Sequence, residues 1–429
     1  MRHFPHERSI RAANLMKNAK KIAVIGGGPA GIMAAIQAAN LGAKVTLFEK
    51  NNRIGKKLSI TGKGRCNLTN VADVEEVVKN IPGNGKFLYS ALKNFPTSAT
   101  INFFENLGLK TKVERGGRVF PVSDKAAEVI EVLEKKLALL DVEIKFNSKV
   151  TKILVENKKV TGLEVGGKFF DFDKIILASG GKSYPATGST GDGFELAKNL
   201  GHTITEILPA LVPLEVEEDF VKILQGLSLK NISVTLFADE KKITEIFGEM
   251  LFTHFGVSGP IILTLSRTVA KLLAEKKFVE LQINLKPALT TEQLDARILR
   301  DFEKFKKKSA KNALVELLPH KLIEVILDLS FIDLEKKVTE ITKAERQMLL
   351  KNLRGLTLTI TKTRPISEAI VTSGGVSVKE INPKTMESKI ISGLYFVGEV
   401  ADVDGFTGGF NLQSAWSMGN AAGIFAATE

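Results

Sequence analysis

The sequence has very little cysteine and no long apolar run, and each absence excludes a class of protein. Of its 429 residues one is a cysteine, Cys66, which rules out an internal disulfide, a C-x-x-C redox pair and a zinc site built from cysteines. We expect no metal site. No run of about eighteen apolar residues occurs, so we expect no membrane-spanning helix. A single cysteine also fits a reducing compartment, and we expect a cytoplasmic location.

The chain is basic, with a net charge of +12 from 60 Lys and Arg against 48 Asp and Glu. We interpret this charge as a solvated surface, although a basic surface also attracts phosphorylated cofactors, nucleic acid or anionic lipid. The lysines are scattered and no aromatic-rich RNA-binding motif accompanies them. We therefore do not expect a nucleic-acid partner.

Residues 21–50 have the pattern of a complete βαβ unit that binds a dinucleotide. An apolar run at 22–25 predicts a buried strand, residues 29–40 a helix rich in small residues, and 45–48 a second strand that ends at Glu49. Between the first strand and the helix, three glycines give the spacing G-x-G-x-x-G: Gly26, Gly28 and Gly31.

Each glycine of this motif has a physical role. Gly26 permits a tight turn, Gly28 lets a pyrophosphate approach the backbone, and Gly31 lets the helix pack close to the sheet. Glu49 lies 18 residues after Gly31, where a carboxylate accepts hydrogen bonds from ribose hydroxyls and disfavours a 2′-phosphate. The motif therefore predicts FAD or NAD rather than NADP. No second G-x-G-x-x-G occurs in the chain.

The middle third of the chain differs from both ends in its predicted secondary structure and composition. From about residue 206 alternating strands suggest a small β domain, and 290–353 is mainly helical and rich in lysine. Strands return at 356, followed by a glycine-rich loop that enters a helix near Asn411. We therefore expect a nucleotide-binding fold that is split by an insertion. The basic residues before Lys21 are expected to form an ordinary extension, with a transit peptide as the alternative.

Six motifs in order give the chain a specific resemblance. It resembles the family of FAD-binding proteins that includes bile-acid-inducible steroid reductases (BaiN-like) and aminoacetone oxidases. The match extends from about Lys21 to Gly423. The motifs are IGGGPAG, ending at Gly31, TGKGRCNLTN (61–70), ASGGKSYPATGSTGDG (178–193), GEMLFTHFGVSGP (248–260), TSGGVSVKEINPKTMESK (372–389) and GLYFVGEVADVDGFTGGFNLQSAWSMG (393–419).

The resemblance implies an α/β architecture: a split Rossmann-like, three-layer ββα domain that binds FAD, with an inserted β-barrel-like domain and a helical domain. The expected boundaries are 1–20 for an N-terminal extension, 21–205 and 356–429 for the two parts of the FAD-binding domain, 206–255 with 278–288 for the barrel-like domain, and 256–277 with 289–355 for the helical domain.

The resemblance also implies where FAD contacts the chain. Positions along the phosphates and the AMP half are expected to be Gly26, Gly28, Pro29, Ala30, Gly31, Glu49, Lys50, Lys57, Val150, Ala178, Ser179 and Gly180. Positions near the ribityl chain or the flavin are expected to be Arg65, Cys66, Asn67 and Thr69. Gly398, Glu399 and Asp404 are expected near the pyrophosphate and the ribityl chain, and Gly409, Phe410, Asn411 and Leu412 at the flavin N1/O2 edge. Helix-start N–H groups at the flavin N1/O2 edge would stabilise the anionic reduced flavin.

Two side chains are candidates for catalysis. Tyr184 can donate a proton to a substrate, or it can simply pack against the cofactor. His254 can titrate near neutral pH, or it can be a structural residue that caps a helix. Cys66 is expected to be a small buried residue, because it has no partner cysteine.

Three functions follow from these observations. The first is an FAD-dependent oxidoreductase, an NAD(P)H-linked reductase of an activated C=C bond in a small organic substrate, with NAD(P)H as a transient electron donor. The second is an amine oxidase of the aminoacetone-oxidase type that uses O2. The third, motivated by the net charge, is an RNA-associated flavoprotein. The substrate, the direction of electron flow and the oligomeric state do not follow from the sequence.

Overall fold

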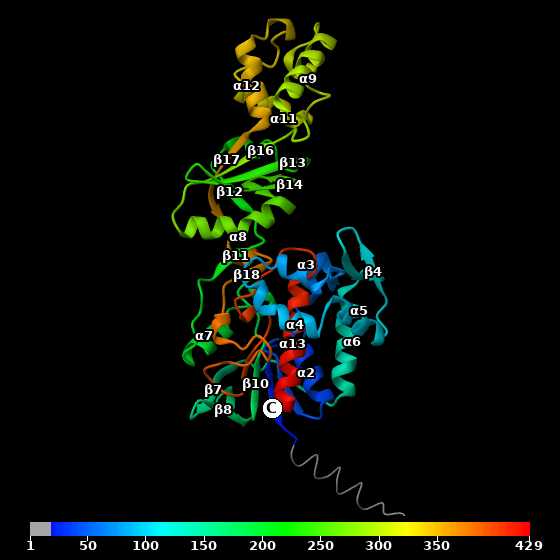
Figure 1. Ribbon diagram of the computed structural model, residues 1–429, viewed down its shortest axis with the longest axis vertical. Helices are drawn as coiled ribbons and strands as arrows, with labels where there is room; N and C mark the ends of the chain where they lie inside the picture. Colours follow the sequence, from blue (N-terminus) through cyan, green and yellow to red (C-terminus); the bar gives the residue numbers. More distant parts are fainter. Residues whose placement is uncertain (1–18) are drawn as a thin grey trace, which may run out of the picture. The chain divides into compact units, whose positions relative to one another are not determined.

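The computed structural model describes residues 19–429, which form two compact units (Figure 1). Unit 1 contains the described residues up to Ile207 together with Val371–Glu429, and unit 2 is the continuous segment Leu208–Ile370. The expected extension, residues 1–20, lies outside the described residues except for positions 19 and 20. The nucleotide-binding fold is therefore split by an insertion, as the sequence predicted.

Unit 1 is built on a parallel five-stranded sheet with the strand order β19-β10-β1-β2-β6. Its strands are β1 (Lys21–Ile25), β2 (Lys44–Phe48), β6 (Glu143–Lys145), β10 (Lys174–Leu177) and β19 (Leu394–Phe396). The central strands are short apolar runs that are buried on both faces, as parallel sheets require. The edge strand β19 comes from the segment after the insertion and pairs with β10.

Two helices rich in small residues pack together in unit 1, α2 (Pro29–Asn40) and α13 (Phe410–Thr428) (Figure 1). A Cβ at Gly419 would lie 2.3 Å from the Ala30 carbonyl oxygen, and one at Gly423 would lie 2.4 Å from that of Ala34. Because the contacts advance by four residues on both helices, α2 and α13 run parallel, with both N-terminal ends pointing the same way.

The rest of unit 1 flanks this core with two small sheets and short helices. The sheets have the orders β3-β5-β4 and β7-β8-β9. The elements are β3 (Thr69–Asn70), α3 (Val74–Lys79), α4 (Tyr89–Asn94), α5 (Thr97–Asn106), β4 (Thr111–Glu114), β5 (Arg118–Pro121), α6 (Ala126–Leu139), β7 (Val150–Glu156), β8 (Lys159–Val165), β9 (Lys168–Asp171), α7 (Asp192–Asn199) and β18 (Val371–Ser373).

Unit 2 has its own apolar core around a closed barrel with the strand order β12-β15-β14-β13-β16-β17. The elements are β11 (Leu208–Ala210), β12 (Leu214–Val216), β13 (Ser228–Ala238), β14 (Lys241–Thr253), β15 (Gly256–Ser258), α8 (Pro260–Ala274), β16 (Val279–Asn284), α9 (Thr291–Lys304), α10 (Ala310–Ala313), α11 (His320–Leu329), α12 (Lys343–Arg354) and β17 (Leu356–Thr363).

The barrel differs from the sequence expectation at its last strand. The expectation placed residue 356 at the start of the second FAD-binding segment, but β17 pairs with β12 and β16 and so closes the barrel. Unit 1 resumes at Val371. Among residues 19–429, no helix combines the length and the apolar character needed to cross a bilayer.

Candidate functional site

The three motif glycines divide into two that the fold needs and one that faces open space. Gly26 has a φ of 109°, and a Cβ there would lie 2.5 Å from the Ala178 carbonyl oxygen. A Cβ at Gly31 would lie 2.0 Å from the Gly26 carbonyl oxygen, whereas one at Gly28 would meet no atom within 4 Å. Gly28 therefore leaves room for a ligand, as expected for a phosphate loop.

The start of α2 presents free backbone donors beside this open space. Pro29, at the first helical position, has no N–H group, and the first helical bond runs from the Ile32 N–H to the Gly28 carbonyl at 2.9 Å. The N–H groups of Ala30 and Gly31 precede it and have no partner within the helix. Together with the positive end of the helix dipole they form an anion site.

Glu49 is already fixed in place at the end of β2. It is only 7% exposed, and its Oε2 accepts a hydrogen bond from the Gly27 N–H at 2.8 Å. Its Oε1 accepts from both the backbone N–H and the side-chain amide of Asn51, each at 2.7 Å. The carboxylate keeps lone pairs for a ribose. Sequence reasoning missed Asn51, although its position two residues after Glu49 is a usable signal.

Lys50 links two segments through hydrogen bonds and an ion pair, and it is therefore not an unpaired cation. Its Nζ donates to Thr190 Oγ1 at 2.5 Å and to Asp192 Oδ2 at 2.6 Å, and Lys149 Nζ lies 3.0 Å from Asp192 Oδ1. Burial raises the pKa of Asp192, but the hydrogen bonds from Lys50 and Lys149 outweigh it and hold that pKa at about 2. The tie fixes the start of α7 against the segment that follows β2.

Lys57 and Glu399 form a second tie, between the segments that follow β2 and β19. Lys57 Nζ donates to Glu399 Oε2 and to Ser183 Oγ, both at 2.7 Å. The other carboxylate oxygen accepts from the Thr372 N–H at 2.7 Å and from Ser183 Oγ at 3.0 Å. Burial raises the pKa of Glu399, yet the attraction of Lys57 lowers it overall, so Glu399 is a carboxylate. The sequence indicated both charged residues but not their contact.

The segment around Asn67 supports the start of α13. With its amide oriented to satisfy its neighbours, Asn67 accepts from the Gly409 N–H at 2.9 Å and donates to the Thr69 carbonyl at 2.9 Å. A Cβ at Gly409 would lie 2.3 Å from that carbonyl oxygen. Thr69 Oγ1 also donates to Gln413 Oε1 at 2.5 Å. Gln413 is a buried residue that the sequence did not single out, since its position in an apolar helix gives no signal.

The first turn of α13 leaves its donors open, as the first turn of α2 does. The first bond in this helix runs from the Gln413 N–H to the Gly409 carbonyl at 2.9 Å, so the N–H groups of Phe410, Asn411 and Leu412 precede it. The Asn411 side chain is used differently, because it binds the N–H and the carbonyl of Gly405 at 2.8 and 2.7 Å.

The two helix starts are spaced like two anion sites for one long ligand. Gly419 of α13 lies beside Ala30 near the start of α2, and α13 begins nine residues earlier, at Phe410. At 1.5 Å per residue, α13 begins about 12 Å beyond the start of α2. A dinucleotide that places its pyrophosphate at α2 can place the far end of its flavin at α13. The residues present therefore fit FAD.

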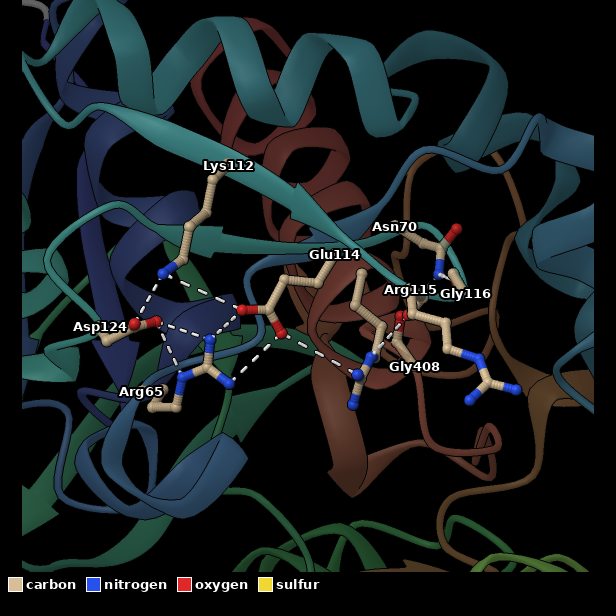
Figure 2. A network of polar contacts seen from close by, with 9 residues as sticks. Arg65, Asn70, Lys112, Glu114, Arg115, Gly116, Asp124 and Gly408 are labelled. Carbon is tan, nitrogen blue, oxygen red and sulfur yellow. Dashed lines mark hydrogen bonds and ion pairs between the residues drawn. The ribbon is translucent and has the colours of Figure 1, made fainter.

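Arg65 pairs with the carboxylates of Glu114, in β4, and of Asp124, which follows β5 (Figure 2). Its guanidinium donates from Nε to Asp124 Oδ1 at 2.8 Å and pairs with Glu114 through Nη2, and it lies 4.1 Å above the centre of the Phe120 ring. Its neighbour Cys66 is buried, and burial raises the pKa of that thiol to about 12. At neutral pH Cys66 is therefore an unreactive thiol.

The remaining predicted positions lie around the same edge of unit 1. Ser148, two residues before Val150, donates its N–H to the Glu49 carbonyl at 2.9 Å, and Ala178 follows β10 beside Gly26. Ser179 Oγ is buried without a hydrogen-bond partner among the described residues. Asp404 is 2% exposed and accepts from Ser373 Oγ at 3.1 Å. At Gly398 the φ of 74° favours glycine.

The two candidate catalytic residues belong to different units. Tyr184, in unit 1, has a φ of 50° just before a short 3-10 turn at 185–187. His254, in unit 2, is exposed in the turn between β14 and β15, with its ring edge-on to Phe255 at 4.9 Å. Among the described residues of its own unit, neither side chain makes a hydrogen bond or ion pair with an acidic or basic group. The catalytic roles of both residues therefore remain predictions.

Comparison with known proteins agrees with this geometry. A family model described as the HI0933-like protein Rossmann domain matches residues 20–425. A 3-dehydro-bile acid delta(4,6)-reductase from Clostridium scindens is 37% identical over 410 residues, which cover 95% of this chain and 99% of that protein. A ribosomal RNA dihydrouridine synthase from Haemophilus influenzae is 30% identical over 406 residues, 94% of this chain and 97% of that protein.

Among solved structures, the open conformation of a flavocytochrome c3 fumarate reductase superposes with a TM-score of 0.52 at 17% identity. The superposition covers 99% of this chain and 81% of that one. At this level of identity the likeness supports the fold alone.

Proposed function

The chain belongs to the HI0933-like family of FAD-binding Rossmann proteins, and from this premise we propose that it is an NAD(P)H-linked reductase of a C=C bond conjugated to a carbonyl group. The coarser part of this statement, a flavin-dependent oxidoreductase, already follows from the family. The observation that carries the finer part is the 37% identity, over almost the whole of both chains, to a reductase named for the double bonds that it reduces.

The two named relatives support one reaction type. The bile-acid reductase acts, by its name, on double bonds in conjugation with a 3-keto group. Dihydrouridine is uridine whose ring C=C bond, conjugated to a carbonyl, has been reduced. When a C=C bond directly conjugated to a carbonyl is reduced in this way, a hydride adds to the carbon β to the carbonyl and a proton adds to the α carbon. FAD, when bound, would supply hydride chemistry at this site, with NAD(P)H as the proposed electron donor.

The residues of this chain have distinct tasks in such a reaction. The N–H groups at the start of α2 and the carboxylate of Glu49 bind the nucleotide half of FAD. The N–H donors and the positive helix end at the first turn of α13 would stabilise the negative charge of a reduced flavin. Tyr184 is our candidate for the proton donor to the α carbon, because its hydroxyl carries a transferable proton.

One other function competes with this proposal, and one other substrate is compatible with its chemistry. An amine oxidase of the aminoacetone-oxidase type would use the same FAD cradle, with O2 as the electron acceptor. An enzyme that reduces a uracil base in RNA would use the same chemistry on a different substrate, and the dihydrouridine synthase relative and the net charge of +12 favour it. A cytoplasmic location agrees with all three.

Anaerobic stopped-flow absorbance near 450 nm tests the proposal. We expect the yellow FAD-loaded protein to bleach on mixing with NADH or NADPH, and to recover its colour when an α,β-unsaturated ketone is added. A Tyr184→Phe variant should bleach at the same rate but recover more slowly by about 10²-fold, the usual contribution of a positioned acid.

The outcomes separate the candidates. Bleaching by small amines and recovery in air, with no response to NAD(P)H, would replace the reductase by the oxidase. A colourless protein that takes up no FAD would overturn both. Normal recovery of the Tyr184→Phe variant would remove Tyr184 from the mechanism and leave the reductase in place.

A further inference from the structure

Gln413, the fourth residue of α13, lies at the centre of a buried polar network. Its side chain is fully buried, as are those of Thr69, Thr100 and Ser417. The Gln413 Oε1 atom accepts hydrogen bonds from Thr69 Oγ1 at 2.5 Å and from Thr100 Oγ1 at 2.8 Å. Its Nε2 atom donates to the Phe95 carbonyl at 3.0 Å and to Ser417 Oγ at 2.9 Å. Both N–H groups and the carbonyl oxygen of the amide are therefore used.

The network requires a neutral amide at this position. The Phe95 carbonyl can only accept a hydrogen bond, whereas the two threonine hydroxyls donate theirs, so the two ends of the side chain need opposite hydrogen-bonding character. A carboxylate has no N–H for the carbonyl, and a lysine or arginine has no acceptor for the hydroxyls. An apolar residue of similar length would leave buried hydroxyl groups without an acceptor, which destabilises the fold.

The partners of this amide join the start of α13 to earlier elements of unit 1. Thr69 belongs to β3, Thr100 belongs to α5, and Phe95 lies just before α5. The next turn of α13 adds a further contact, because Trp416 Nε1 donates to the Leu68 carbonyl at 3.0 Å. Side-chain contacts from two successive turns prevent the helix from sliding or rotating against β3.

The backbone at the start of α13 contacts the same strand. A Cβ at Gly409 would lie 2.3 Å from the Thr69 carbonyl oxygen. The Gln413 N–H makes the first helical bond, to the Gly409 carbonyl at 2.9 Å, and the N–H groups at 410–412 precede it. The residue whose side chain is held by Thr69 is therefore also the residue that directly follows the open N–H groups.

We propose that Gln413 is a positioning residue: through Thr69 it holds the first turn of α13 where the open N–H groups and the positive helix end stabilise a reduced flavin. This inference rests on the proposed flavin site and names the residue that sets how strongly the site favours the reduced form. Stabilisation by fixed dipoles depends on their distance and direction, so a helix start that can move stabilises charge less well. Gln413 acts through the helix and transfers no proton.

The midpoint potential of the FAD-loaded full chain, measured anaerobically against a redox dye, tests the proposal. A Gln413→Met variant keeps the length of the side chain but removes its hydrogen bonds. We expect the preference for reduced over oxidised FAD to fall about tenfold, which lowers the potential of this two-electron couple by about 30 mV. Binding of oxidised FAD should weaken less than binding of reduced FAD, because the positive helix end acts on the negative charge.

Two further variants separate positioning from stability. Thr69→Val removes the contact of Gln413 with β3, so it should lower the same preference, and its effect should not add to that of Gln413→Met. Thr100→Val removes only the contact with α5, so it should lower the urea midpoint but keep the preference within about twofold. If Gln413→Met does not fold, the contrast between Thr69→Val and Thr100→Val decides the question.

Asn352→Leu is the matched control in unit 2. The Asn352 amide, in α12, likewise donates to a carbonyl and to a hydroxyl, those of Leu329 at 2.9 Å and Ser330 at 3.0 Å. Its loss should lower the stability of unit 2 and leave the FAD potential unchanged.

An unchanged potential in a Gln413→Met protein that binds FAD would overturn the proposal. Additive effects of Gln413→Met and Thr69→Val would overturn it as well, and so would an equal shift in Thr100→Val, because loss of stability alone would then explain the change. These results are separate from the reductase test. A protein that binds FAD but is not bleached by NAD(P)H would remove the reductase and leave this inference in place, whereas a protein that takes up no FAD would overturn both.

Discussion

A methyl group added to the phosphate loop would have different effects at its different glycines. At Gly28 an added Cβ meets empty space within the protein, but it would project into the space that the pyrophosphate requires. We expect Gly28→Ala to weaken FAD binding at least tenfold, about 1.4 kcal/mol. The free energy of unfolding of the FAD-free protein should change by no more than about 1 kcal/mol. Fluorescence titration with FAD and urea unfolding measure the two quantities.

Gly31 provides the matched contrast for this experiment. A Cβ there would lie 2.0 Å from a backbone oxygen, so Gly31→Ala should destabilise the FAD-free protein by about 3 kcal/mol or prevent folding. If Gly28→Ala binds FAD as the unmodified protein does, the phosphate does not approach the backbone at this glycine.

At the scale of elements, ion pairs hold α7 and the segment after β2 together. The pKa of Asp192 is about 2 in the folded protein, below its ordinary value of 3.8. A lowered pKa stabilises the fold at pH values above about 4, and that contribution disappears as the pH falls towards 2. We expect Asp192→Asn to lower the Tm at pH 7, and the difference from the unmodified protein to vanish between pH 4 and pH 2.

Asp219→Asn is the control for this pH series. Asp219 also pairs with a lysine, Lys222, but both side chains are largely exposed, so its loss should leave the Tm within about 1 °C at every pH. A difference for Asp192→Asn that persists unchanged down to pH 2 would show that the contact with Lys50 is not electrostatic.

The secondary-structure elements can be predicted from the sequence alone, but the contacts between distant elements cannot. The strands, the helix and the glycines of the βαβ unit follow from periodicity, because their reasons are local. The partners of Lys57 lie 126 and 342 positions away in the chain, so no local pattern predicts them. Likewise, Arg65 was expected near the flavin, and the contacts of its side chain with Glu114 and Asp124 depend on strand pairing that spacing does not reveal.

At the scale of the whole molecule, the insertion is continuous in sequence and has a core of its own. Unit 2 extends from Leu208 to Ile370 and contains a closed barrel, which leaves no open strand edge in that sheet. We expect the isolated segment 208–370 to unfold cooperatively on heating, as measured by circular dichroism, and to take up no FAD. A segment that lacks a cooperative transition would show that unit 2 depends on unit 1.

The order of the central sheet has a consequence for synthesis on the ribosome. Strand β19 completes the sheet beside β10, yet 216 residues separate the end of β10 at Leu177 from the start of β19 at Leu394. At a synthesis rate of about 5–20 residues per second, the edge of β10 stays unpaired for roughly 10–40 s before β19 is made. During that interval the barrel can fold, while the nascent nucleotide fold presents an unpaired edge to other chains. Chaperone demand during translation should therefore come from the first half of the chain, before any flavin is bound.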